Sequence, residues 1–472
     1  RNAKDTGRWH DHNRACADML KSHYQRRPQG VSERLGRHLI AAEDYASALT
    51  PLLQGSREHL ENSEYRGARG LIGLRREALL ALDVPENNPN YGYGWIIEIE
   101  ISRREGHLDE ALQLAVKAVR LATQHNWSVV LPRALEQLGH AYLLIGNLER
   151  ARTAYIEARK LYGESDDIAG VVDCQRGLGQ VAHQRGDLSR ATELLHHALS
   201  SSKKLKDPRR VAECLQATCP VVIQRGDLAL AIDLNRRAME LYEKEGSAHG
   251  VAECRLEEAR IAVLQGDLDR GTSLFEEALQ QCERLGAIRG MTDCLRGLAE
   301  IALLRGWYET ARDGYERVLF LNEASGGDLI LPRIEFAWVL FQEHKHRDAH
   351  AMFLECLQMA RGEDRKTVTA VALSCLVASV SQMGDWMVWW QYFRELGQVL
   401  ESIRIVDVHI ALSLQSAAEL AFEAGQQEEA KDAYAIARRQ WETLGRKDKL
   451  AQIDAVLHQL SERELATKPV QS

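Results

Sequence analysis

Histidine and acidic side chains alternate closely enough near residue 346 to suggest a metal site. His344, His346 and His350 lie among Glu343 and Asp348, and zinc accepts both imidazole and carboxylate ligands. Tight binding requires ligands that converge and are held by further hydrogen bonds. A solvated turn that happens to be rich in histidine explains the same residues, so we expect no metal here.

Motifs of nucleotide-dependent enzymes are missing from the sequence. The triplet that begins at His346 reads His-Arg-Asp, as in a kinase catalytic loop, but no Asn follows at the required spacing and no Asp-Phe-Gly occurs. No Gly-Lys pair is present either, which a phosphate-binding loop needs. We therefore expect these residues to carry no enzyme activity and to need no cofactor.

Cysteines recur at a fixed interval, at Cys174, Cys214, Cys254 and Cys294. This spacing puts them on successive helices, roughly 10 Å apart, which is too far for a shared metal or a disulfide. We expect small buried packing residues. The nine scattered cysteines favour a reducing cytoplasm.

Composition favours a folded helical protein over the other classes. The 472 residues are 45% hydrophobic and 27% charged, with only 9 prolines, and scarce proline permits long helices. The net charge of −8 argues against nucleic acid as a partner. No stretch approaches the roughly 18 apolar residues of a membrane span, so we expect no membrane partner.

The chain begins with Arg1 instead of methionine, and we expect it to be a fragment of a longer polypeptide.

A repeat of 40 residues runs through the chain and predicts paired helices. Its glycines are Gly106, Gly146, Gly186, Gly226, Gly266 and Gly306. A small residue follows each glycine five positions later: Ala111, Ala151, Ala191, Ala231, Gly271 and Ala311. Apolar residues at helical spacing over Leu131–Ile145 and Leu148–Tyr162 predict two helices. Glycine suits the turn between them, and Asp187, Asp227 and Asp267 are predicted N-caps.

This pattern resembles the tetratricopeptide repeat family. Residues at the family's positions include Gly139, Tyr142, Gly146, Ala151, Tyr155 and Ala158. The family's common repeat has 34 residues, so these longer units are similar to those of bacterial regulators and kinesin light chains. The resemblance implies an all-α, right-handed α-solenoid of about ten helix–turn–helix repeats with a C-terminal capping helix.

Four segments follow from the repeat and its flanks. Residues 1–30 are predicted to be a basic linker helix, and 31–90 a degenerate first repeat with an extra helix and a loop. Residues 91–445 form the repeat array, with His344 in a glycine position. Residues 446–472 contain the capping helix, at about Lys447–Ser461, and a polar tail.

The resemblance also implies that the first helix of each repeat lines a concave groove. The side chains that it directs inward are Arg133, Glu136, His140, Asp173, Arg176, Gln180, His183, Glu213, Gln216, Glu253, Arg260, Asp293, Arg296, Glu300, Trp338 and Phe341. Two interpretations remain open. The charged residues form a ladder of acid–arginine pairs between repeats, each contributing ~0–1 kcal/mol if exposed, or they bind a basic or mixed-charge peptide.

A cluster of aromatic residues stands apart from the groove. It includes Trp386, Trp389 and Trp390, and Trp389 occupies the position where other repeats have Ala or Gly. Aromatic residues concentrate binding energy at interfaces, but local repacking of the core also explains the cluster. Both interpretations remain open.

The first 40 residues resemble a linker in STAND signal-transduction ATPases. The segment Glu33–Leu39 is similar to the one that joins a nucleotide-binding module to helical repeats, particularly in bacterial proteins that also carry a serine/threonine kinase domain. This resemblance implies a cytoplasmic sensor that binds a protein, a peptide or its own upstream ATPase or kinase domains. The alternative is a free-standing adaptor that binds peptides.

Overall fold

The computed structural model describes residues 8–26, 30–403 and 405–467, and within them the secondary structure is helical, with no strand. The N-terminal helices are α2 (Trp9–Arg26), α3 (Ser32–Ala41), α4 (Tyr45–Glu61) and α5 (Tyr65–Ala81). The first helices of the following pairs are α6 (Pro89–Arg104), α8 (Val130–Leu144), α10 (Ile168–Gln184), α12 (Pro208–Gln224), α14 (Ala248–Gln265), α16 (Ile288–Leu304), α18 (Ile330–Gln342), α20 (Lys366–Met383) and α22 (Val408–Glu423). The second helices are α7 (Leu108–Gln124), α9 (Leu148–Glu164), α11 (Leu188–Leu205), α13 (Leu228–Glu245), α15 (Leu268–Leu285), α17 (Tyr308–Ser325), α19 (His346–Gly362), α21 (Trp386–Ile403) and α23 (Gln427–Thr443). The last helix is α24 (Lys447–Thr467).

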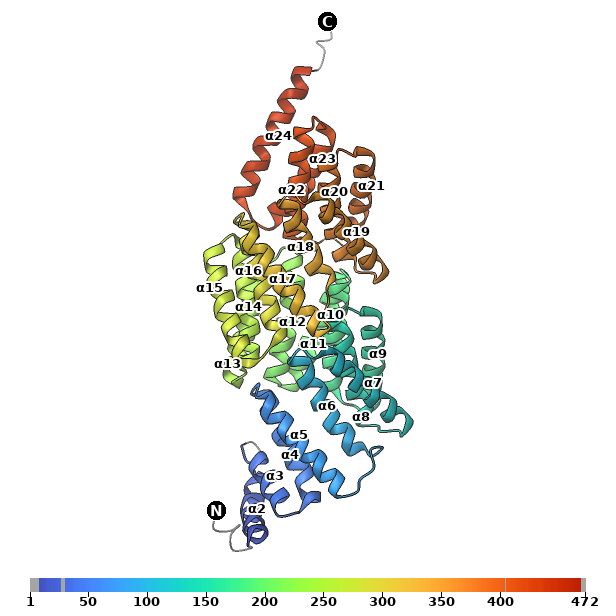
Figure 1. The fold of residues 1–472 in the computed structure, drawn as a ribbon, viewed down its shortest axis with the longest axis vertical. Helices are drawn as coiled ribbons and strands as arrows, with labels where there is room; N and C mark the ends of the chain where they lie inside the picture. The colour runs from blue at the N-terminus through green and yellow to red at the C-terminus, as the bar shows by residue number, and fades with distance from the viewer. Residues whose placement is uncertain (1–7, 27–29, 404, 468–472) are drawn as a thin grey trace.

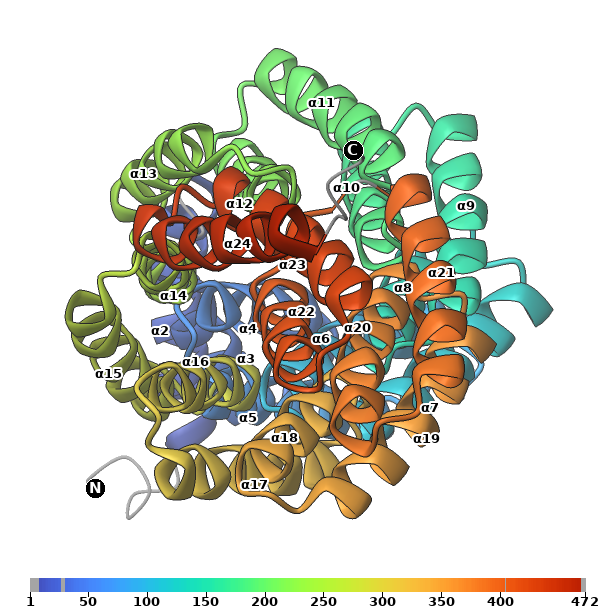
Figure 2. The same cartoon turned by 90° about the horizontal axis from the view of Figure 1, so that it is seen from above.

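These helix pairs wind into an elongated superhelix. The chain rises from α2 at one end to α24 at the other (Figure 1). Seen along the axis, α9, α11, α13, α15 and α17 lie on the outside, and α12, α14, α16 and α22 lie nearer the centre (Figure 2). The predicted all-α solenoid of helix–turn–helix repeats is confirmed.

Local sequence explains where the second helices begin. The carboxylates of Asp187, Asp227 and Asp267 accept hydrogen bonds from backbone amides three residues later, as N-caps do. The preceding turns need a left-handed residue, and the six repeat glycines supply it. His344, in the position that lacks glycine, also has a positive φ of 63°. The repeat pattern therefore predicts the turn geometry correctly.

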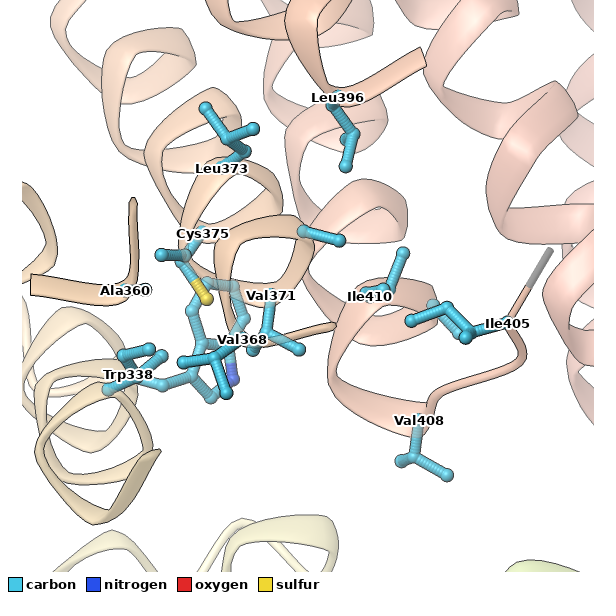
Figure 3. Packing of buried hydrophobic residues seen from close by; sticks show 14 of the residues in the cluster. Trp338, Ala360, Val368, Val371, Leu373, Cys375, Leu396, Ile405, Val408 and Ile410 are labelled. Carbon is cyan, nitrogen blue, oxygen red and sulfur yellow. The ribbon is translucent and has the colours of Figure 1, made fainter. Parts of the chain in front are cut away.

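Small residues allow the paired helices to pack closely. Ala151, Ala191 and Ala311 are fully buried, and a Cβ atom at Gly139 would lie 2.9 Å from the ring of Tyr155. The four periodic cysteines are buried as expected. In the C-terminal half, the core around Trp338, Val368 and Ile410 joins α18, α20 and α22 (Figure 3).

Successive turns of the superhelix touch one another at several of the repeat glycines. A Cβ atom at Gly106 would lie 2.6 Å from Cβ of Ile288, at the start of α16. A Cβ atom at Gly226 would clash with Cγ2 of Thr443, at the end of α23. The amide of Val406 also donates a hydrogen bond to the carbonyl of Gln224 (2.8 Å). We call these contacts the inter-turn seam.

One helix departs from the expectation that no segment is apolar enough to cross a membrane. By length and composition alone, α20 could do so. However, 78% of it is buried inside the protein, because it lies between α19, α21 and α22 in the main core. Burial on several sides explains why this helix is apolar all round.

The C-terminal helix covers the last helix pair. Ile453 of α24 is 1% exposed, and Leu450, Val456 and Leu457 pack against the same core. Such cover is what a capping helix provides. The described part of the N-terminal segment is the helix α2, and residues 1–7 and 27–29 of the predicted linker lie outside the described residues.

Candidate binding surface

The inward side chains of the first helices form a continuous charged surface, which we call the inner face. It runs from the end of α4 through α6, α8, α10, α12, α14 and α16 to α18 and α22. Most of its side chains are half-buried, so solvent still reaches them. The structure pairs several of the groove candidates with charged or polar side chains of the next repeat.

At α8, polar groups of the inner face are tied to the second helix of the same repeat. The hydroxyl of Tyr162 donates to Glu136 (2.7 Å), and that of Tyr155 meets Nδ1 of His140 (2.7 Å). Burial raises the pKa of Glu136. Burial and the nearby Arg103 and Arg176 lower the pKa of His140 well below its ordinary value. His140 is therefore neutral near pH 7.

Between α10 and α12, two arginines cross in opposite directions. Arg210 on α12 binds Asp173 on α10 (2.9 Å), and Arg176 on α10 binds Glu213 on α12 (3.2 Å). Burial and the charge of Glu136 raise the pKa of Asp173. Burial also opposes ionisation of Glu213, but its arginine neighbours outweigh this and lower its pKa.

Similar contacts continue along the inner face toward the C-terminus. Gln216 donates to Glu253 (2.5 Å), Arg260 binds Asp293 (3.1 Å), and Arg296 lies 3.7 Å from Glu335. His409 of α22 also approaches Oε1 of Glu335 (3.5 Å).

Three further candidates occupy the same helices. Gln180 and Glu300 are half-buried. Burial lowers the pKa of His183 to about 4, so its ring is neutral at physiological pH.

The N-terminal part of this surface was not among the residues predicted from the repeat. Glu100 binds Arg104 within α6 (2.5 Å). Arg209 on α12 binds Glu213 of the same helix (3.2 Å) and also Glu61 at the end of α4 (3.2 Å). Burial opposes ionisation of Glu100, but Arg104, Arg103 and Arg209 lower its pKa to about 2. The 40-residue repeat is degenerate before Gly106, so its positions could not be extended to α4 and α6.

Two groove candidates lie in the core. Trp338 and Phe341 are 4% and 5% exposed, and their rings stack at 5.1 Å. Residues on α18 are enclosed by α19 and α20, so a position that faces inward in other repeats is buried here.

The aromatic cluster divides between core and surface. Trp389 is fully buried and stacks on Phe393 at 4.5 Å, and its indole donates to Ser381 (3.0 Å). Trp386 and Trp390 are half-buried, and Trp390 donates to Glu429 on α23 (2.9 Å).

The histidine-rich turn separates its side chains. His344 and His346 have ring centroids 5.6 Å apart, whereas His350 meets the hydroxyl of Ser379 (3.0 Å). Across the described ranges, no group of three or more histidine, cysteine or acidic residues is placed to hold a metal.

A cleft of about 380 Å³ opens between α16, α18, α22 and the start of α24. Apolar side chains such as Leu304 and Trp338 line it beside polar groups that include Gln342 and Arg446. It lies beside the C-terminal part of the inner face.

Comparison with known proteins agrees with this fold. A family model described as Tetratricopeptide repeat matches residues 130–204, which span α8 to α11. The predicted resemblance to tetratricopeptide-repeat proteins is confirmed. No curated protein matches the sequence.

Several solved structures are similar. A Rap protein complexed with competence and sporulation factor has a TM-score of 0.55 at 14% identity, over 76% of this chain and 99% of that one. A Rap conjugation gene regulator of the plasmid pLS20, in complex with the Phr* peptide, has a TM-score of 0.49 at 12% identity, over 75% and 97%. A STAND protein with a tetratricopeptide repeat sensor, from Pyrococcus horikoshii, has a TM-score of 0.36 at 16% identity, over 85% and 55%, so this chain spans about half its length. At such identities the first comparison shows the fold alone, and we conclude nothing further from the other two.

Proposed function

We propose that this chain is a binding scaffold whose inner face recognises a peptide or a protein segment of mixed charge. The observation that carries the proposal is the half-buried row of charged side chains that runs from α6 to α18. A solenoid presents such an extended surface to a partner. The structurally similar Rap protein is complexed with a competence and sporulation factor, which supports this role for the fold.

The scaffold acts by binding and not by chemistry of its own. Several charged side chains of the inner face are engaged with one another in acid–arginine pairs, for example Arg176 with Glu213. A ligand of mixed charge can exchange these partners for its own without leaving a buried charge alone, which would be costly.

A finer proposal concerns the molecule in which this scaffold works. The segment Glu33–Leu39 supports a cytoplasmic sensor region attached to an ATPase or a kinase in a bacterial signalling protein. Sequencing the gene upstream of Arg1 tests this, because a phosphate-binding loop is expected there. An initiator methionine directly before Arg1 would favour the free-standing adaptor instead.

Selection from a random dodecapeptide phage library tests the binding role. We expect the selected peptides to bind the wild-type protein and to lose at least tenfold in affinity with Gln180→Trp, which adds a bulky ring to the inner face. Glu277→Trp, at an exposed position on α15, is the matched control and should not change affinity. Peptides that are insensitive to Gln180→Trp, or more sensitive to the control, contradict binding on the inner face.

A further inference from the structure

The cleft beside the inner face is assembled from segments that lie far apart in the sequence. Leu304 comes from the end of α16, Trp338 from α18 and Leu412 from α22, and the start of α24 contributes Lys449. Its volume of about 380 Å³ falls within the range of sites that bind small ligands, roughly 300–1,000 Å³. A hollow of this size can hold a single side chain of a bound peptide.

The apolar residues of the cleft belong to the edge of the main core. Tyr308 and Leu412 pack against this core, and Trp338 is one of its buried members. Leu268, Leu304 and Tyr308 are half-buried, so part of their apolar surface stays in contact with solvent. An apolar group that enters the cleft covers this surface, which is favourable.

The repeat pattern changes where a second helix borders the cleft. The helices α9, α11, α13 and α15 begin with Asn or Asp followed by Leu, as in Asp267–Leu268. At α17, Trp307 and Tyr308 take these two positions, and the helix has no side-chain cap. Trp307 is 55% exposed, and the guanidinium of Arg305 lies 4.9 Å from its ring centroid. Two solvent-accessible aromatic residues in place of a stabilising cap indicate a binding role, because functional sites are where such local rules are broken.

Polar groups of the cleft have unused hydrogen-bonding capacity. In the part of the chain that the structure describes, no hydrogen bond engages the half-buried side chains of Gln342 and Ser416. Gln415, by contrast, accepts from the indole of Trp441 (3.1 Å) and donates to Glu419 (3.0 Å). An amide and a hydroxyl each donate and accept, so Gln342 and Ser416 match the N–H and C=O groups of a peptide backbone.

The charges of the cleft balance one another. Arg446 binds Asp448 (2.8 Å), and Lys449 and Glu419 add one charge of each sign to the lining. An ion that enters a partly buried site loses hydration and needs an opposite charge in return. A lining without net charge therefore favours an uncharged side chain.

The cleft continues the inner face along two helices. Glu335 on α18 and His409 on α22 lie 3.5 Å apart on the inner face. Each is followed three residues later by a residue of the cleft, Trp338 and Leu412, and residues three apart are neighbours on a helix surface. A peptide that contacts the inner face at α18 can therefore place its next residues in the cleft.

We propose that the cleft anchors one aromatic side chain of the bound peptide, and that Gln342 and Ser416 hydrogen-bond the backbone amides beside it. This rests on the proposed function and adds the chemistry of one ligand group. Tyr308 and Trp338 supply rings to the lining, and aromatic pairs gain more than the area that they bury. Aromatic anchors in pockets also carry much of the binding energy at protein interfaces.

Saturation-transfer difference NMR with two small probes tests the anchor. N-acetyl-L-tryptophanamide has an indole between two amides, and N-acetyl-L-alaninamide has the same amides with a methyl group. We expect wild-type protein to bind the tryptophan probe at least tenfold more tightly. Ser416→Trp, which fills the cleft, should abolish this preference. Glu423→Trp, at the exposed end of the same helix, is the matched control and should preserve it.

A third probe tests the polar groups. The compound 3-methylindole has the ring without the amides, so we expect wild-type protein to bind it at least tenfold more weakly than the tryptophan probe. Gln342→Ala with Ser416→Ala should remove this difference and leave the affinity for 3-methylindole unchanged. An undiminished preference for the tryptophan probe in the double variant overturns the role of these two side chains.

Unfolding midpoints in urea show whether each variant is folded. If Ser416→Trp does not fold, Tyr308→Ala decides, because it removes one ring from the lining. A loss of at least fivefold in affinity for the tryptophan probe supports the anchor, and an unchanged affinity overturns it. Equal binding of the two N-acetylated probes by the wild type overturns it without any variant.

Failure of the anchor is distinguishable from failure of the proposed function. Library peptides that lose affinity with Gln180→Trp but not with Ser416→Trp contradict the anchor and leave binding on the inner face intact. If the tryptophan probe depends on Ser416 while the library peptides are insensitive to both variants, the cleft takes a free aromatic molecule and the peptide assignment is wrong.

Discussion

At the scale of single residues, the inner face shows how neighbours decide the state of a buried charge. Glu100 and Glu136 are both acidic groups of the inner face, on adjacent repeats. Arginines lower the pKa of Glu100 to about 2 against the effect of burial, whereas burial prevails for Glu136 and raises its pKa. The sequence identifies both residues as acidic, but the direction of each pKa shift depends on the partners that the fold places around the carboxylate.

Acid titration should expose the contribution of Glu100. Its folded pKa lies below the unfolded value, so its stabilisation is present above the unfolded pKa and is lost as pH falls toward 2. A shift of this size corresponds to about 3 kcal/mol. We expect Glu100→Gln to lower stability most above pH 5, with the difference from wild type closing as the pH falls. Urea unfolding at pH 6, 4 and 3 measures this, and a difference that is constant with pH contradicts it.

At the scale of helices, short-range chemistry fixes where each element starts. Asp227 caps α13 by accepting from the amide of Leu230 (3.0 Å), and the same arrangement recurs at Asp187 and Asp267. The sequence predicted these caps because a cap needs only the few residues around it. The partners of an inward side chain come from other repeats, and the local sequence therefore does not predict them.

Removing a cap should cost a defined amount of stability. We expect Asp227→Ala to lower the free energy of unfolding by about 1 kcal/mol, because an amide at the start of α13 loses its acceptor. Asp227→Asn keeps an acceptor oxygen and should lose much less. Urea denaturation followed by circular dichroism compares the variants. Equal losses would show that the hydrogen bond is not what matters at this position.

At the scale of the whole molecule, the inter-turn seam brings together segments that lie far apart in the sequence, such as Gly106 and Ile288. The repeat glycines differ in their roles, since all six adopt a left-handed turn but only some also leave room for the next turn of the superhelix. Gly106 has both, with a φ of +83° and Ile288 against it. Gly306 has only the first, with a φ of +75° and no heavy atom within 4 Å of a Cβ position.

Alanine at these two glycines should therefore have unequal effects. Gly306→Ala meets only the left-handed penalty of about 1–2 kcal/mol. Gly106→Ala adds a clash with the start of α16, which we expect to cost a further ~1–3 kcal/mol. Unfolding midpoints in urea give the comparison. Equal losses would mean that the two turns do not press on each other at Gly106.

The sequence by itself determined the helical repeat, because the 40-residue period is visible in the order of residues alone. It also determined the turns and the caps, because a glycine or an aspartate acts there on only the few residues around it. It also placed residues such as Asp173 and Arg176 on one surface. Only the tertiary structure decided that Trp338 and Phe341 are enclosed, that α20 is an apolar core helix, and that Arg209 pairs with the distant Glu61. These outcomes depend on the pitch of the superhelix and on which distant helices it brings together. Small rotations between repeats add up over many units, and the total rotation cannot be predicted from any local sequence pattern.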